Sequence, residues 1–252
     1  MVSPMRGKRN IKITMAYDGT HYHGWQRQAG AMTLQQVIEE KIEKMTGEPV
    51  RIHASGRTDA GVHALNQVCN FLSSSGIEPL ALKRGLNSLL PNDILIKEVS
   101  YAPMDFHARY SAKAKTYEYR ILNRREPDPF VRHYSWHIPQ RLDLEEINKC
   151  MSLLLGKEDF SSFRSSGSGN VNPVREMYRC EVRLLPGHIL SFVFEANGFL
   201  RHMVRNMVGT LVEIGRGKLD CKGFQEILRS RDRRMAGVKA PPQGLFLREV
   251  RY

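Results

Sequence analysis

The chain has 252 residues, of which 41% are hydrophobic and 25% charged, so it can bury a core and form one large domain or two of ordinary size. It carries 38 Lys and Arg against 26 Asp and Glu, and the net charge of +12 favours a polyanionic partner, nucleic acid first, because each neutralised phosphate releases condensed counterions. No apolar run of about 18 residues and no signal-like N-terminus occurs, so we expect a soluble, cytoplasmic protein without a membrane partner.

Four cysteines lie far apart in the sequence, at Cys69, Cys150, Cys180 and Cys221. They form no C-x-x-C pair, and no cysteine and histidine residues stand at the spacing of zinc ligands. We therefore expect reduced, partly buried thiols and no bound metal.

The first half of the chain predicts the element order β-α-β-β-α-β. Apolar residues alternate from Asn10 to Tyr17, which is the period of a half-buried strand. Thr33 and Gln36 predict a capping box, in which each side chain satisfies a backbone donor at the start of a helix, and Gly47 is placed to end that helix. The other elements are expected as strands over 50–54, 67–72 and 94–99 and as a helix over 80–90, which Pro91 stops.

The second half repeats this order from Ala114. Asp143 and Glu146 predict a second capping box at the start of a helix, and a short additional helix is expected over 221–231. Ser, Gly and Asn residues over 164–173 indicate a loop, which is either a mobile lid or a plain connection. The remaining elements are strands over 114–121, 174–185, 189–196 and 245–250, a helix over 143–154 and a helix over 200–214.

Two consecutive units of this kind predict an α+β protein that consists of two ferredoxin-like halves with antiparallel sheets. We place the N-terminal half at residues 1–105 and the C-terminal half at residues 106–252. The halves share negligible sequence identity, so the duplication is inferred from the order of elements alone.

The stretch ASGRTDAGVHA connects the second and third predicted strands and runs from Ala54 to Ala64. Gly56 and Gly61 permit backbone conformations and close approaches that other residues do not, so the stretch is first of all typical of a tight turn. The alternative is that Arg57 and Asp59 face a common cleft, where the cation keeps the carboxylate ionised as a nucleophile or base. Arg57 could equally hold a phosphate or fill the gap left by a base taken from its stack.

Other catalytic signatures are absent from the sequence. No second carboxylate accompanies Asp59 at short range, and there is no phosphate-binding Gly-rich loop and no Ser/His/Asp signature. Any chemistry at this stretch would therefore be done by one carboxylate without a cofactor.

Five blocks occur in order along nearly the whole chain: YDGTHYHGWQRQ (17–28), GRTDAGVHA (56–64), DFHARYSAKAKTYEY (105–119), DFSSFR (159–164) and FLRHMVRNMVGTLVEIGRG (199–217). Together they resemble the TruA-type tRNA pseudouridine synthases. GRTDAGVHA is highly specific for that family, and the other blocks support the resemblance by their order.

The resemblance implies that the protein isomerises uridine to pseudouridine at positions 38, 39 or 40 in the anticodon arm of tRNA. It implies a homodimer that needs no metal, nucleotide or organic cofactor, and a flipped uridine in a central catalytic cleft between the two halves. The catalytic aspartate of the family falls on Asp59, which either attacks C1′ of the ribose or removes a ribose proton.

Four further residues match family positions that bind the substrate: Tyr117, Arg57, Arg205 and Arg164. Tyr117 can stack on an extruded base or exchange a proton, but it can also be an ordinary core-facing strand residue. Arg205 lies on an apolar helix face, where it is either an arginine that snorkels from the edge or a partner of Asp59.

Two other functions stay open from the sequence. A non-catalytic RNA-binding protein should carry the aromatic motif of such modules, which we do not find. A pseudouridine synthase with another target is the second alternative, because the catalytic motif reports the reaction better than the target. Tyr22 and Trp25 can stack on RNA or pack in the fold, and we expect packing. Some of the basic residues Arg6, Lys8, Arg9, Arg229, Arg231, Arg233 and Arg234 are expected to contact phosphates.

Overall fold

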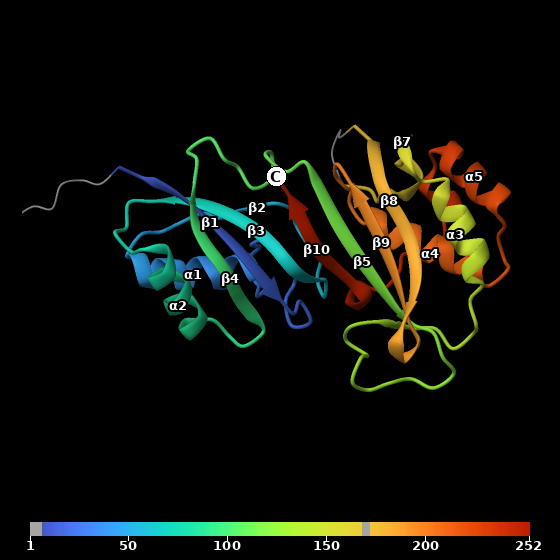
Figure 1. Ribbon diagram of the computed structural model, residues 1–252, viewed down its shortest axis with the longest axis horizontal. Helices are drawn as coiled ribbons and strands as arrows, with labels where there is room; N and C mark the ends of the chain where they lie inside the picture. The colour runs from blue at the N-terminus through green and yellow to red at the C-terminus, as the bar shows by residue number, and fades with distance from the viewer. Residues whose placement is uncertain (1–6, 168–171) are drawn as a thin grey trace, which may run out of the picture. The chain divides into compact units, whose positions relative to one another are not determined.

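The structure is a computed structural model that describes residues 7–167 and 172–252 (Figure 1). It contains two compact units: the first comprises the chain up to Ala112 together with Leu247–Tyr252, and the second comprises Lys113–Phe246. The first unit thus extends beyond residue 105, the boundary expected from the sequence. Asn70 explains this extension, because its Oδ1 accepts from Ala108 N at 2.8 Å and its Nδ2 donates to Phe106 O at 3.3 Å.

The first unit has the sheet order β4-β1-β3-β2, in which neighbouring strands are antiparallel. This is the order of a ferredoxin-like fold and confirms the predicted arrangement. Helices α1 and α2 pack against each other on one face of the sheet, where the apolar faces of helices and strands form the core (Figure 1). The elements are β1 Arg9–Tyr17, α1 Leu34–Thr46, β2 His53–Ala54, β3 His63–Ser73, α2 Pro79–Leu89 and β4 Ile94–Ala102.

Two local predictions in the first unit are corrected. The strand expected over 50–54 is only His53–Ala54, because Ile52 N donates to Glu39 Oε1 of α1 at 3.0 Å. Thr33 is the N-cap residue of α1 but its side chain makes no capping hydrogen bond, and Gln36 Nε2 donates instead to Glu40 Oε1 at 2.9 Å. The capping box is therefore wrong.

β10 begins in the second unit at Leu245 and continues into the first from Leu247; together with it the strands of the second half have the order β10-β5-β9-β8-β7, with β6 beside β5. The first four strands repeat the ferredoxin-like order, and β7 extends the sheet beyond β8. Helix α3 packs against α4 and α5, and Asp143 Oδ1 accepts from Glu146 N at 3.1 Å as predicted. The other half of the predicted capping box is wrong, because Asp143 N donates to Gly215 O at 2.9 Å and not to the Glu146 side chain. The elements are β5 Ala114–Leu122, β6 Trp136–His137, α3 Leu144–Ser152, β7 Gly156–Asp159, β8 Val174–Leu185, β9 Ile189–Ala196, α4 Met203–Gly215, α5 Cys221–Ser230 and β10 Leu245–Arg251.

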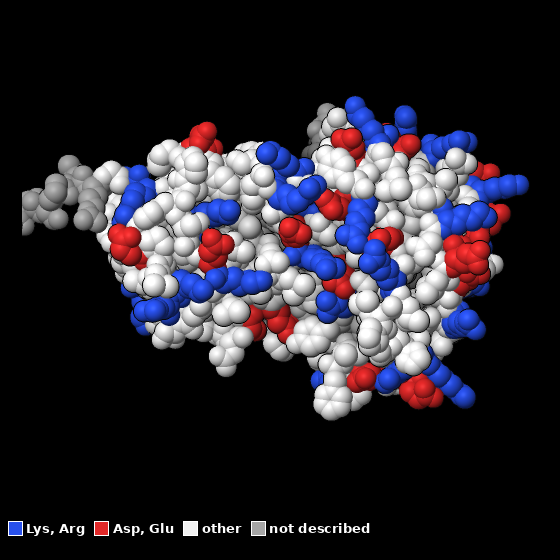
Figure 2. All heavy atoms as spheres, in the orientation of Figure 1, with Lys and Arg blue, Asp and Glu red and all other residues white. Residues whose placement is uncertain are grey.

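Charged side chains cover the surface of both units. Figure 2 shows Lys and Arg spread over the visible face, with Asp and Glu dispersed between them. Among the described residues, no helix has the length and hydropathy to cross a bilayer. Arg6 of the basic N-terminal group lies outside the described residues.

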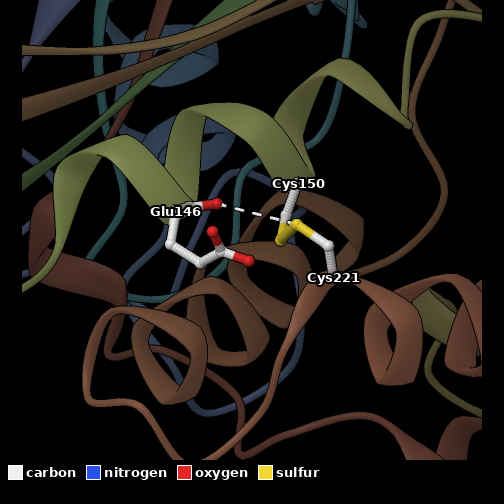
Figure 3. A group of neighbouring side chains, drawn as sticks. All are labelled: Glu146, Cys150 and Cys221. Atoms are coloured by element: carbon white, nitrogen blue, oxygen red, sulfur yellow. Dashed lines mark hydrogen bonds between the residues drawn. A yellow bond between two sulfur atoms is a disulfide. The ribbon is translucent and has the colours of Figure 1, made fainter.

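Two of the four cysteines form a disulfide, so the expectation of four reduced thiols is wrong. Cys150 on α3 and Cys221 at the start of α5 are bonded, with their Cα atoms 5.2 Å apart (Figure 3). They are separated by 71 residues in the sequence, and only the packing of α3 against α5 brings them together. Cys69 and Cys180 are free thiols, and burial raises the pKa of both.

Glu146 lies beside this disulfide and completes the one group of three potential metal-ligating side chains within the described ranges. Its carbonyl oxygen is 3.8 Å from Cys221 Sγ (Figure 3). Metal binding by cysteine requires the thiolate, and here the two sulfur atoms are bonded to each other. In its disulfide form the group therefore offers one carboxylate and is no metal site.

Candidate active site

The loop over 55–62 joins β2 to β3 and carries Arg57 and Asp59. Its tip is a tight turn, because Val62 N donates to Asp59 O at 3.1 Å and Gly61 adopts a φ of 75°. The left-handed region is costly for residues with a Cβ, which explains the glycine at position 61. The turn predicted from the sequence is therefore present, and its shape does not by itself decide what Asp59 does.

Buried polar side chains hold the loop from the side of the sheet. Thr58 Oγ1 and Tyr17 OH are 2.8 Å apart, and Gln67 Nε2 donates to Gly56 O at 2.8 Å. Ser55 Oγ donates to Gln67 Oε1 at 2.6 Å. Burial raises the pKa of Tyr17 well above its usual value, so the phenol stays neutral and available for hydrogen bonding.

The segment after β1 holds the loop from the other side. Trp25 N donates to Thr58 O at 3.0 Å, and Gly61 N donates to Tyr22 O at 3.4 Å. Gly24 has a φ of 88°, and a Cβ there would lie 2.8 Å from Thr58 O. The YDGTHYHGWQRQ block is thus a clamp on the Asp59 loop.

The same segment contains Tyr22 and Trp25, for which the sequence left open stacking on RNA or packing in the fold. Both side chains are buried, and Tyr22 OH donates to Asp93 Oδ1 at 2.6 Å. Packing is confirmed for these two residues, and a base cannot stack on rings that the fold already covers.

The clamped backbone presents two charged side chains. Asp59 is half-buried and Arg57 is exposed, whereas Thr58 between them is buried. A carboxylate on a backbone that is held from two sides is preorganised for a reaction, because little conformational freedom has to be lost when a substrate binds.

A second pair of ionisable groups lies next to this loop and was not singled out from the sequence. His63 Nδ1 is 3.0 Å from Asp18 Oδ1 and 3.1 Å from Gly19 N, and His63 is buried. Tyr17 of β1 pairs with Ala64 of β3, so the residues just beyond, Asp18 and His63, meet at the end of the two strands. The antiparallel order was the signal that could have predicted this pair.

Tyr117 lies on β5 in the second unit and is 8% exposed. Phe199 contacts its ring edge to face, with 5.0 Å between the ring centroids. Tyr119 is fully buried and donates from its hydroxyl to Pro241 O at 2.8 Å. The two tyrosines share one face of the sheet, and both are buried.

Arg205 lies in the first turn of α4 and is 7% exposed, so the interpretation of a snorkelling arginine is wrong. Its Nε donates to Ala240 O at 2.8 Å, and its carbonyl accepts from Ala240 N at 3.1 Å. Gly209 on the same helix permits this approach, since a Cβ there would lie 1.7 Å from Val238 O. The chain after α5 therefore packs directly on α4 and orients the guanidinium.

Arg164 follows a short 3-10 helix, Ser161–Phe163, in the second unit. Asn206 Nδ2, from the residue after Arg205, donates to Phe163 O at 2.8 Å. The DFSSFR block is thus tied to α4, so the second unit positions Arg164 and Arg205 through one helix. Residues 168–171 of the loop over 164–173, for which a lid and a plain connection both stay open, lie outside the described residues.

Comparisons with known proteins agree along the whole chain. A family model described as tRNA pseudouridine synthase matches residues 13–111 and 150–252. A protein of Thermoanaerobacter sp. (strain X514) named tRNA pseudouridine synthase A is 46% identical over 244 residues, which are 97% of this chain and 100% of the relative. Proteins of the same name from Acetivibrio thermocellus and Geobacillus sp. (strain WCH70) are 46% and 43% identical, over 97% of this chain and 100% and 98% of the relatives.

Proposed function

This chain belongs to the tRNA pseudouridine synthase family, whose members isomerise uridine in tRNA to pseudouridine, and we propose that Asp59 is its catalytic residue. The observation that carries the proposal is the clamped loop: hydrogen bonds to β3 and to the segment after β1 hold Gly56 O and Thr58 O before Asp59 and Gly61 N after it. A turn that needed only to connect two strands would not require buried partners from two other segments.

The reaction suits one carboxylate without a cofactor. The N1–C1′ glycosidic bond of uridine breaks, the uracil turns while it is held, and a C5–C1′ bond forms; the proton leaves C5 and N1 gains one. Asp59 starts the reaction either by attacking C1′ or by removing a ribose proton. Both routes need an ionised carboxylate at a defined place beside the ribose, which is what a rigid loop supplies.

The uridine has to leave its stack before a side chain can reach C1′. Base flipping costs a few kcal/mol, so the protein must supply interactions that compensate for the lost stacking. We assign this role to the exposed Arg57, which either holds a backbone phosphate or fills the gap left by the base.

Tyr117, Arg205 and Arg164 are proposed to bind the flipped nucleotide. Tyr117 is a buried aromatic ring that contacts Phe199 edge to face, and in a base-flipping enzyme such a ring can pack against the uracil while its phenol exchanges a proton with C5. Arg205 is a buried cation whose Nε donates to Ala240 O, and a cation near a carboxylate favours the ionised form of that carboxylate. We propose that it supports the ionised form of Asp59, and that Arg164 holds a phosphate.

We propose that the enzyme modifies positions 38, 39 or 40 in the anticodon arm of tRNA. We also propose that it acts as a homodimer in the cytoplasm. Mapping pseudouridine in total tRNA from a strain that lacks this gene tests the target. Loss of pseudouridine at one or more of these positions alone is the expected result, and loss at any other position instead would refute the assignment.

Replacing the carboxylate tests the catalytic role. Asp59→Asn should fold, bind tRNA with nearly wild-type affinity and form no pseudouridine, because the amide can neither attack C1′ nor act as a base. Glu98→Gln is the matched control, since it removes an exposed carboxylate from β4 of the same unit and should leave turnover unchanged. A turnover rate near that of wild type in Asp59→Asn would refute the proposal.

A further inference from the structure

Three aromatic rings form a continuous stack in the first unit, outside the Asp59 loop. The ring centroids of His53 and His107 are 5.0 Å apart, and those of His107 and Tyr110 are 4.4 Å apart. Tyr110 ends the stack and is 76% exposed. Arg109 lies beside it, with its guanidinium carbon 5.7 Å from the tyrosine ring centre.

The backbone under the stack is held by tertiary hydrogen bonds. Ala108 is fully buried; its N donates to Asn70 Oδ1 and its O accepts from Tyr252 OH, each at 2.8 Å. Ser111 N also donates to His107 O at 2.9 Å. The exposed ring of Tyr110 thus sits on a fixed support, so presenting an aromatic surface to a ligand costs little conformational entropy.

The chemistry of the stack suits a nucleotide. Burial, and the neighbouring His53 and Arg109, lower the pKa of His107, and its Nδ1 accepts from Arg109 N at 3.1 Å. The middle ring is therefore neutral and supports the Tyr110 ring by stacking. Arg109 lies beside the stack and Asp105 is the one acid over 105–113, so the surroundings favour a phosphate.

We propose that the His53–His107–Tyr110 stack binds an unpaired nucleotide of the tRNA other than the uridine that reacts, with its base on the Tyr110 ring and its phosphate near Arg109. The proposal rests on the proposed function, in that the ligand is the tRNA substrate. β2 begins with His53 and runs directly into the Asp59 loop, so the stack and the catalytic loop share one support. A second nucleotide held at this stack would fix the register of the RNA on the enzyme.

A second copy of this chain is the competing occupant of an exposed aromatic surface. Protein interfaces place aromatic residues in cores that are depleted of charge, whereas single-stranded RNA sites combine aromatic rings with cations. The charged flank of this stack favours RNA, and the oligomeric state of the variants is measured alongside binding.

The experiment compares Tyr110→Ala, Tyr110→Phe and the control Phe130→Ala. Phe130 is 88% exposed and lies in the second unit, so it controls for the loss of an exposed ring. The probe is an unmodified anticodon stem-loop RNA, with Kd measured by titration and kcat and KM from pseudouridine formation.

Tyr110→Ala should raise Kd and KM by about 5- to 150-fold, the range expected for one stacked base, with kcat within about twofold. Tyr110→Phe should restore binding, because the ring and not the hydroxyl stacks. When the nucleotide that stacks on Tyr110 is replaced by an abasic one, the Kd of the wild type should rise. The Kd of Tyr110→Ala should change little, because that variant has already lost the stacking contact.

Unchanged Kd in Tyr110→Ala would overturn the proposal, as would a change of oligomeric state in sedimentation that accounts for any loss. Failure of the catalytic proposal is distinguishable, since it would appear as turnover by Asp59→Asn while the Tyr110 series still changes Kd. The two sets of variants therefore test different statements.

Discussion

Gly24 controls the position of the Asp59 backbone from outside the loop. Its φ of 88° is one that residues with a Cβ rarely adopt, and a Cβ would lie 2.8 Å from Thr58 O and 3.1 Å from Asp59 C. A glycine is therefore required at position 24 for two reasons: its own backbone conformation, and the close approach of the backbone at Thr58 and Asp59.

Gly24→Ala should displace the Asp59 loop. A displacement of about 1 Å at a reacting group can cost on the order of a hundredfold in rate, so we expect kcat to fall by at least tenfold while KM for tRNA changes little. Steady-state kinetics on unmodified tRNA measures this.

Gly30→Ala is the matched control for that variant. Gly30 has a φ of 73°, but no atom lies within 4 Å of the added Cβ. The control should lose about 1 kcal/mol of stability through backbone strain and keep its kcat. Equal losses of kcat in both variants would contradict the interpretation that the segment around Gly24 holds the Asp59 loop in place.

At the scale of elements, helix α5 is attached to the second unit by contacts that the sequence did not indicate. The Cys150–Cys221 disulfide joins it to α3, and Ser162 Oγ donates to Ile227 O at 2.6 Å. An ion pair between Arg231 Nε and Asp159 Oδ2 at 3.2 Å lies at the exposed end of the helix. Since α5 also contacts the 3-10 helix before Arg164, it supports part of the proposed substrate site.

Removing the disulfide should lower stability. The bond closes a loop with a sequence separation of 71 residues, and the double variant Cys150→Ala, Cys221→Ala should lose about 2–4 kcal/mol in the free energy of unfolding. Urea denaturation of oxidised wild type against this variant measures the loss.

Cys180→Ala is the control, because Cys180 is a free thiol of the same unit. It keeps the Cys150–Cys221 bond, so its unfolding midpoint should fall after reduction as that of wild type does, whereas the midpoint of the double variant should not depend on reductant. If oxidised and reduced wild type unfold at the same urea concentration, the disulfide makes no contribution and the expectation fails.

For the whole molecule, the net charge of +12 determines how binding depends on salt. Basic side chains are distributed over the visible face in Figure 2 and not confined to one spot, as expected for a protein that contacts an extended polyanion. The affinity for tRNA therefore includes a large contribution from counterion release.

The tRNA affinity should fall steeply with salt. The slope of log K against log salt is about −0.7 to −0.9 for each phosphate neutralised, so roughly six contacts would cost about a thousandfold between 50 and 200 mM salt. If Arg57 holds a phosphate, Arg57→Gln should reduce the magnitude of this slope by about 0.7 to 0.9, which is the contribution of one phosphate contact. A flat response in wild type would refute the electrostatic contribution.

The sequence by itself determined the order of the main helices and strands and the family, whereas the short strands β6 and β7 were not predicted. Periodicity is local, so β8 and β9 occur at their predicted bounds, and the repeated order already indicated two ferredoxin-like units. The GRTDAGVHA motif identified the reaction, because the comparisons confirm the family that it indicated.

Tertiary structure alone decided the contacts between distant residues. The hydrogen bond from Ile52 to Glu39 shortened β2, helix packing brought Cys150 to Cys221, and the chain at Ala240 buried Arg205. None of these leaves a local pattern, because each depends on which segments the finished fold places side by side. The same reason hid the clamp on Asp59 and the aromatic stack that ends at Tyr110.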